Sequence, residues 1–173
     1  MHTFSKCFSC LLLLTISQPG WTQSSDSVTS TLAVSRISAQ ADGKEVAVPA
    51  NAAKPGDVLE YVAEYRNAGK DVARKLEATL PIPVGTEYLP GSGRPAPASA
   101  SLDGKIYEPE PLKRRVKQPN GESVEQRVPY SEYRFLRWAA RDLAVGTSYK
   151  YSARVRLLMA PAPVGAASPG IRP

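Results

Sequence analysis

A two-residue rhythm of apolar and polar side chains constrains the fold of this chain more than any other feature. In VLEYVAEYR, residues 58–66, apolar and aromatic positions alternate with positions that include Glu60, Glu64 and Arg66. Because successive side chains of a β-strand point to opposite faces, this pattern is typical of a strand with one buried face. SYKYSARVRL, residues 148–157, repeats the rhythm with basic residues on its polar face. The two segments predict an all-β chain of antiparallel sheets.

Composition and turn residues place the other strands. Sixteen prolines and twelve glycines favour many short strands over a helical bundle. Further strands are predicted at 30–40, 44–48, 72–80, 86–89 and 133–138. The side chains predicted to fill the core are those of Leu59, Tyr61, Tyr65, Leu80, Trp138, Tyr149, Tyr151 and Val155.

Residues that favour turns separate these strands. The segment NAGKD lies between 58–66 and 72–80, so these two strands form either an antiparallel hairpin or a turn between sheets. An Asp-Gly pair at 103–104 favours a further tight hairpin. The positions predicted to shape turns are Gly56, Asp57, Asn67, Gly69, Pro81, Asp103, Gly104 and Gly146.

A long segment before the last strands predicts an inserted hairpin or ordered arm. Residues 108–129 exceed what a compact sandwich needs between strands, and Pro119-Asn120-Gly121 lies at their middle. The segment contains the run KRRVK. Its basic residues predict either a prong that binds an anionic polymer or a solvated hairpin without a ligand. The residues of this predicted prong are Lys113, Arg114, Arg115, Lys117 and Arg127.

The two ends of the chain differ from its middle. Residues 1–23 combine Lys6 with a short apolar run and a Pro-Gly break, as a signal peptide does, and the run is too short to span a membrane. We therefore expect export to the periplasm, the cell surface or the medium, with no membrane span after cleavage. Residues 24–30 predict a flexible lead-in, 31–158 a folded domain, and 159–173 a disordered Pro/Ala-rich tail.

Residue types that carry most enzyme chemistry are confined to the leader. His2 is the only histidine, and Cys7 and Cys10 are the only cysteines. The expected mature chain thus lacks Ser-His-Asp and Cys-His centres, the usual zinc ligands and disulfides. We predict that the protein is not an enzyme and that it binds no cofactor and no metal. The alternative is a lectin-like domain or a weak hydrolase that uses the carboxylate pair Glu60 and Glu64, or Glu108 and Glu110.

Two further surface hypotheses arise from the strands. If the last two strands pair, their basic residues form a stripe that docks an acidic partner or protects a sheet edge. A set of aromatic side chains forms either a sugar platform or, as their strand spacing favours, part of the core. The residues of this set are Tyr61, Tyr65, Trp138, Tyr149 and Tyr151. The residues of the stripe are Arg134, Arg137, Lys150, Arg154 and Arg156.

Several blocks in a fixed order resemble a known family. Gly56-Asp57, Asn67-Ala68-Gly69 and Leu80-Pro81 are followed by ASLDGKIY and by LRWAARDLAVGTSYKYSARVRL. Together these blocks are similar to the bacterial immunoglobulin-like (Ig-like) "conserved repeat" domain, known as domain of unknown function eleven, over roughly residues 30–158. Ala78 stands where the family often has aspartate, and 108–129 resemble an insertion. The resemblance implies an Ig-like antiparallel β-sandwich of about seven strands in a secreted or surface-exposed protein.

These observations together predict a non-enzymatic exported module, present in a single copy, for binding or assembly at the cell envelope. The expected partner is an envelope component or a protein, with an anionic polymer as one possibility. The formal net charge of +6 is compatible with an anionic ligand. Nucleic acid is not the expected ligand, because only Tyr107 and Tyr130 flank the basic run as stacking platforms.

Overall fold

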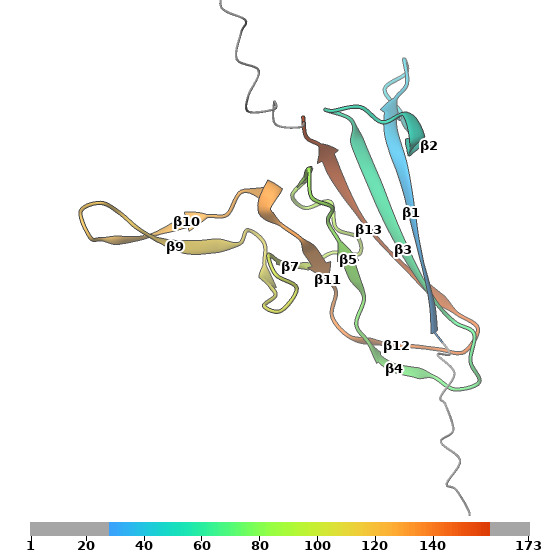
Figure 1. Cartoon of the computed structure of the whole chain (residues 1–173). Coiled ribbons are helices and arrows are strands. Elements are labelled where there is room, and N and C mark those ends of the chain that lie inside the picture. The colour runs from blue at the N-terminus through green and yellow to red at the C-terminus, as the bar shows by residue number, and fades with distance from the viewer. Residues whose placement is uncertain (1–27, 160–173) are drawn as a thin grey trace, which may run out of the picture.

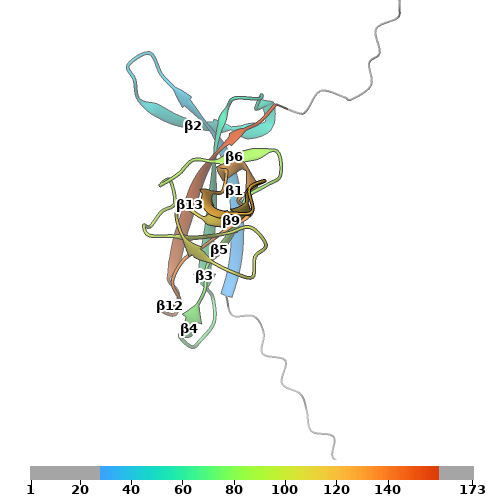
Figure 2. The same cartoon turned by 90° about the vertical axis from the view of Figure 1, so that its left-hand side faces the viewer.

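Two antiparallel β-sheets packed face to face form the body of the described chain (Figure 1). The computed structural model describes residues 28–159. The first sheet has the order β2 (Glu45–Pro49), β1 (Val28–Ala39), β3 (Val58–Asn67), β13 (Ser148–Leu157) and β6 (Thr86–Tyr88). The second has the order β5 (Thr79–Pro81), β11 (Phe135–Arg137), β7 (Ser99–Ser101) and β8 (Glu108–Pro109). In Figure 2 the first sheet lies behind the second.

Two small ribbons and two short 3-10 helices complete the described chain. One ribbon pairs β4 (Ala73–Leu76) with β12 (Arg141–Leu143), and the other pairs β9 (Lys113–Lys117) with β10 (Ser123–Arg127). The 3-10 helices are η1 (Ala50–Ala52) and η2 (Tyr130–Glu132). The predicted all-β sandwich is confirmed. The predicted count of about seven strands is wrong, because residues 28–159 form thirteen strands, many of them only two to five residues long.

The predicted strand 72–80 shows why the count differs. It divides into β4 and β5, with Lys75 at a φ of 54° just before the break. A positive φ is costly for a residue with a side chain and takes the backbone out of the extended conformation. β4 then pairs with β12, and β5 pairs with β11 in the second sheet. The segments 58–66 and 72–80 therefore do not form an antiparallel hairpin; the chain between them is a turn between sheets, which was the other alternative.

Asn67 holds the corner where the chain leaves the first sheet. Its side chain is fully buried, and its Nδ2 donates to the carbonyl oxygens of Asp71 at 2.8 Å and Leu143 at 2.9 Å. Its Oδ1 accepts from the backbone N–H of Gly69 at 3.0 Å. Gly69 has no positive φ, so its part in the turn is that hydrogen bond. Gly146 has a φ of 72° and donates its N–H to the carbonyl of Asn67, which joins the last turn to the same corner.

The other predicted turn residues hold their loops by backbone contacts. The Asp57 carboxylate accepts from the N–H of Lys54 at 2.9 Å, next to Gly56. The Asp103 carboxylate accepts from the N–H groups of Lys105 and Ile106, and these bonds lower the pKa of Asp103. Gly104 follows with a φ of 76°, and Pro81 ends β5 opposite Phe135.

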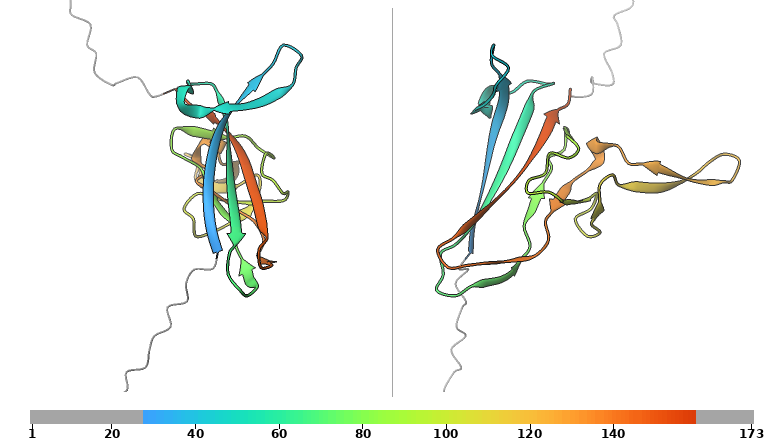
Figure 3. Two further views of the ribbon diagram at one scale, coloured as in Figure 1. Left: turned by 90° about the vertical axis from the view of Figure 1, so that its right-hand side faces the viewer. Right: turned by 180° about the vertical axis from the view of Figure 1, so that it is seen from behind.

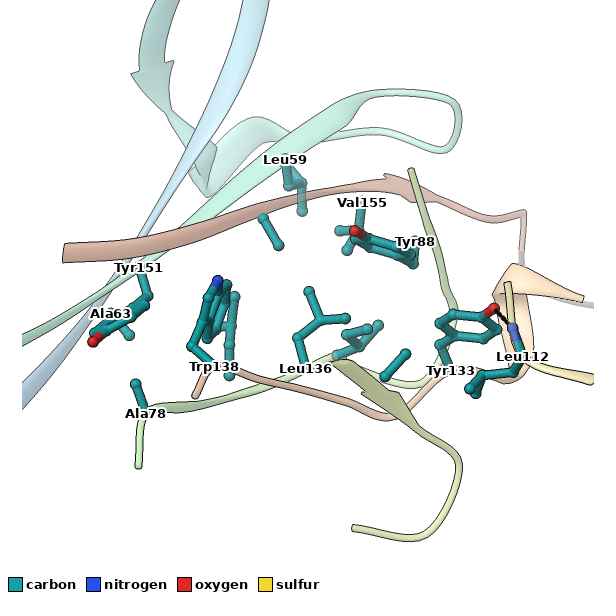
Figure 4. Close-up of a cluster of buried hydrophobic side chains, with 14 of the residues drawn as sticks. Leu59, Ala63, Ala78, Tyr88, Leu112, Tyr133, Leu136, Trp138, Tyr151 and Val155 are labelled. Carbon is teal, nitrogen blue, oxygen red and sulfur yellow. Dashed lines mark hydrogen bonds between the residues drawn. The ribbon is translucent and has the colours of Figure 1, made fainter. Parts of the chain in front are cut away.

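The core lies between the two sheets (Figure 4). The first sheet contributes Leu59, Tyr151 and Val155, and the second contributes Leu80 and Leu136 with the adjoining Trp138. Of the predicted core residues, Leu59, Leu80, Trp138, Tyr151 and Val155 are buried, whereas Tyr61, Tyr65 and Tyr149 are half-buried at its margin. Tyr133, a further candidate core residue of the predicted strand 133–138, is fully buried, and so is Tyr88, which was not predicted; their ring centroids are 5.8 Å apart.

The first strand begins earlier than the sequence predicted. Residues 28–30 belong to β1 because they pair with Tyr65, Arg66 and Asn67 of β3, although 24–30 were predicted as a flexible lead-in. The predicted signal peptide at 1–23 and residues 160–173 of the predicted tail lie outside the described residues. Within 28–159, no helix has the length and apolar character needed to cross a membrane.

Candidate functional site

The hairpin of β9 and β10, which we call the arm, projects away from the sandwich (Figure 1). Its strands pair antiparallel from Lys113 opposite Arg127 to Lys117 opposite Ser123. A tight turn closes its tip, where the N–H of Gln118 donates to the carbonyl of Glu122 at 2.7 Å. Gly121 adopts a φ of 86° in this turn, a conformation that favours glycine.

The arm is rooted in the core rather than attached by a loose loop. Leu112 and Val128, the residues that flank its two strands, are both buried. The N–H of Val128 donates to the carbonyl of Leu112 at 2.9 Å. The N–H of Leu112 in turn donates to the buried hydroxyl of Tyr133 at 2.7 Å (Figure 4). These bonds fix the direction in which the arm leaves the sandwich.

Strand register divides the arm into two different faces. Residues directly opposite each other in an antiparallel pair share a face, and alternate residues of one strand share it too. One face, which we call the cationic face, therefore carries four basic side chains and one acidic side chain, that of Glu125. The Nζ of Lys113 lies 2.7 Å from Oε2 of Glu125. The four basic residues of the cationic face are Lys113, Arg115, Lys117 and Arg127.

Arg114 does not join the other predicted prong residues. It lies on the opposite face of the arm, beside the Val116–Val124 pair. Its guanidinium donates to both carboxylate oxygens of Glu132 in η2, at 2.6 and 3.0 Å. This paired geometry is the strongest form of an Arg–carboxylate contact. Arg114 thus ties the arm to the sandwich. Alternation within KRRVK is enough to place Arg114 on the face opposite Lys113 and Arg115, and the prediction of a single prong overlooked it.

The predicted basic stripe is wrong, because β11 and β13 belong to different sheets. On the outer face of the first sheet, each basic side chain of β13 instead lies beside an acid. Lys150 is 3.6 Å from Glu64, and Arg156 is 3.6 Å from Glu87. Arg154 lies 3.1 Å from Glu60 and 2.7 Å from Glu45, and these bonds raise its pKa. We call these seven residues the charge ladder: Glu45, Glu60, Glu64, Glu87, Lys150, Arg154 and Arg156.

The remaining residues of that predicted stripe have partners of their own. Arg134 donates to the carbonyls of Ser131 and Tyr133, both at 2.7 Å. Arg137 lies 3.5 Å from Glu77, and its guanidinium stands 3.9 Å from the ring centroid of Tyr107. Neither residue leaves its positive charge without a neighbouring acceptor or aromatic ring.

Three of the four carboxylates considered for hydrolysis have partners within the protein, and the fourth is exposed. Glu60 and Glu64 belong to the charge ladder, and hydrogen bonding from Ser148 together with the charge of Lys150 lowers the pKa of Glu64. Glu110 accepts from the buried hydroxyl of Tyr88 at 2.7 Å. Burial, followed by this bond, raises the pKa of Tyr88. Glu108 is exposed at the start of β8. A carboxyl that acts as a general acid needs a raised pKa. The pKa of Glu64 is lowered, which is the opposite of what that role requires.

A hollow of ≈ 380 Å³ lies beside the second sheet, with Glu77, Arg137 and Trp138 among its lining residues. Its polar groups are engaged with the protein itself. Arg137 contacts Glu77 and Tyr107, and the Nε1 of Trp138 donates to the carbonyl of Pro95 at 2.6 Å. Across residues 28–159, no three His, Cys, Asp or Glu side chains gather as a metal site requires. The cationic face is therefore the candidate functional site.

Comparison of the chain with protein-family models, with curated proteins and with solved structures finds no match. The resemblance to the Ig-like repeat domain stays a prediction.

Proposed function

We propose that this chain is a non-enzymatic, exported Ig-like module that binds a phosphate-bearing polymer of the cell envelope through the cationic face of its arm. The observation that carries the proposal is the imbalance of that face, where four basic side chains surround Glu125. Elsewhere on the sandwich, the basic residues of the charge ladder lie beside acids. Binding to a polyanion needs charge that the protein has not already neutralised.

The rooting of the arm supports the same function. A flexible hairpin loses conformational entropy when it binds, and this loss weakens binding. The arm is already fixed by Leu112, Tyr133 and the Arg114–Glu132 pair, so it loses less entropy when it binds. Export rests on the leader-like residues 1–23. Among the contacts within residues 28–159, none favours the lectin-like or hydrolase alternative over binding by the arm.

The test is binding of the purified chain to immobilised lipopolysaccharide across a series of salt concentrations. Arg115→Glu combined with Lys117→Glu reverses two of the four basic charges of the cationic face and should weaken binding roughly 1,000-fold, because the change is four charge units at about 1 kcal/mol per unit near an anionic surface. Affinity of the unchanged chain should fall steadily as salt rises.

The matched control makes the same change of net charge on the charge ladder, with Lys150→Glu combined with Arg156→Glu. This variant should keep its affinity within about threefold, since those side chains lie on the outer face of the first sheet, away from the arm, and salt screens charges at that separation. Equal losses in both variants would show that net charge alone governs binding. No binding by the unchanged chain would contradict the proposal outright.

A further inference from the structure

The edge of β1 contains a long stretch of backbone without a strand partner. β2 pairs only with residues 35–39 of β1, and across residues 28–159 no strand pairs with the same edge at 28–34. Figure 3 (left) shows β1 in blue at the margin of the first sheet, with β2 crossing only one end of it. The seven unpaired residues span about 24 Å, which is as long as a typical whole strand.

This edge carries none of the features that protect exposed strands from pairing. Residues 28–34, VTSTLAV, contain no charged residue, proline or glycine, and their register with β3 is unbroken. The edge strand β8 of the second sheet, by contrast, is two residues long and consists of a glutamate and a proline. Natural proteins block edges with charges, prolines, bulges and short strands. The free edge of β1 is thus suited to accept another strand.

Exposed apolar side chains accompany the free backbone. Leu32 and Val34 are 53% and 42% exposed. They pair in register with Ala63 and Tyr61 of β3, so they lie on the face of the sheet that packs against the core. Their exposure means that the second sheet does not cover them. A strand added beside β1 would bring side chains next to both.

We propose that the occupant of this edge is β1 of a second copy of the chain, paired antiparallel about a two-fold axis at Thr31. That register places Val28 opposite Val34, Thr29 opposite Ala33, and Ser30 opposite Leu32. The large Leu32 therefore meets the small Ser30, valine meets valine, and no two charges face each other. Such self-complementarity is what a two-fold interface requires, because each residue pair occurs twice.

The geometry of this pairing has a consequence for the arms. The two-fold axis of an antiparallel strand pair is perpendicular to the sheet, so both second sheets lie on the same side of the joined first sheets. The arm projects away from the first sheet (Figure 3, right). Both arms of the dimer therefore extend towards one surface. If the proposed function holds, two cationic faces then bind one polymer layer together, which raises the apparent affinity without new contacts.

The experiment is analytical ultracentrifugation of the purified chain over a dilution series, without any polymer. The unchanged chain should sediment at twice the mass of one chain and dissociate on dilution. Thr31→Lys places two ammonium groups opposite each other on the axis and should weaken the dimer at least tenfold. Ala39→Lys is the matched control, because Ala39 lies on the same face of β1 where β2 already covers the edge, and its dimer should be unchanged.

A second measurement keeps the proposal testable if Thr31→Lys impairs folding. Thr31→Cys, in a chain with Cys7→Ser and Cys10→Ser, should form a disulfide-linked dimer under mild oxidation, and Ala39→Cys in the same background should not. A monomeric unchanged chain at every concentration, or a Thr31→Lys chain that dimerises as tightly as the unchanged one, would overturn the proposal. Since no polymer is present, either result leaves the proposed function of the arm untouched.

Discussion

The charge ladder and the cationic face carry similar numbers of basic residues and differ in what lies opposite them. On the ladder, strand register places Glu64 opposite Lys150 and Glu60 opposite Arg154. On the arm, register places only Arg115 opposite an acid, Glu125, whereas Lys113 lies opposite Arg127 and Lys117 opposite Ser123. The first arrangement neutralises its charges within the sheet, and the second leaves most of them to the solvent or to a ligand.

The difference teaches that a count of basic residues does not identify a binding surface in a β protein. Alternation along one strand tells which residues share a face, but the partner strand decides whether they meet acids. Exposed ion pairs such as those of the ladder contribute little to stability, typically about 0 to 1 kcal/mol each. Their main effect here is to keep the outer face of the first sheet close to neutral.

The largest expected effect is a loss of stability when the contact between the arm and the core is removed. Leu112→Ala should lower the free energy of unfolding by about 3 kcal/mol, because it removes a buried side chain at the root of the arm. Chemical denaturation of the purified chain measures this change. Val124→Ala, on the exposed part of β10, is the control and should cost about 0.5 kcal/mol or less. Equal, small losses for both would mean that the arm is a hairpin independent of the core. The arm and the charge ladder would then differ in mobility as well as in charge.

A smaller effect sharpens the charge contrast itself. Glu125→Gln removes the one acid of the cationic face and should tighten binding to lipopolysaccharide about fivefold, which corresponds to about 1 kcal/mol. Glu60→Gln makes the same change on the ladder and should alter binding less than twofold, because Arg154 keeps its contact with Glu45. Titration of both variants at one salt concentration measures the difference. A larger gain from Glu60→Gln would place the binding surface on the first sheet.

The smallest expected effect is on the pH at which Glu64 of the charge ladder loses its negative charge. Ser148 and Lys150 hold the pKa of Glu64 below its ordinary value of 4.5. A carboxyl with a lowered folded pKa contributes stability above its unfolded pKa and loses it as pH falls through the folded value. The side-chain carboxyl of Glu64, followed by NMR, should therefore titrate below pH 4.5, and Lys150→Ala should move the midpoint upward. A midpoint at or above 4.5 in the unchanged chain would contradict the ladder geometry.

Much of the sandwich was predictable because alternation is a local property. The faces of 58–66 and 148–157 follow from residue spacing, and Leu59, Tyr151 and Val155 are buried accordingly. Tyr88 lies in a strand of only three residues and was missed as a core residue, since so short a strand shows no period. The hairpin of the arm was predictable from Pro119-Asn120-Gly121, and centring it on Asn120 would also have given the observed register.

The predicted stripe failed for a different reason. Sequence proximity suggested that 133–138 pairs with 148–157, whereas β11 pairs with β5 and β7 and lies in the opposite sheet. Sheet order depends on which strands bury their apolar faces best together, and that choice is made between segments far apart in the chain. The same limit applied to Asn67, whose hydrogen bond to the carbonyl of Leu143 joins residues 76 positions apart.

The residues alone were enough to predict that this protein is built of antiparallel strands, to name most of its core side chains, and to locate the arm. These follow from local rules of side-chain alternation and turn preference. The three-dimensional pairing of strands was needed to see which basic residues are neutralised, that Arg114 ties the arm to the sandwich, and that residues 28–34 of β1 have no partner on one edge within residues 28–159. Each of these depends on the neighbour across a strand pair, and hydrogen bonding between distant segments fixes that neighbour.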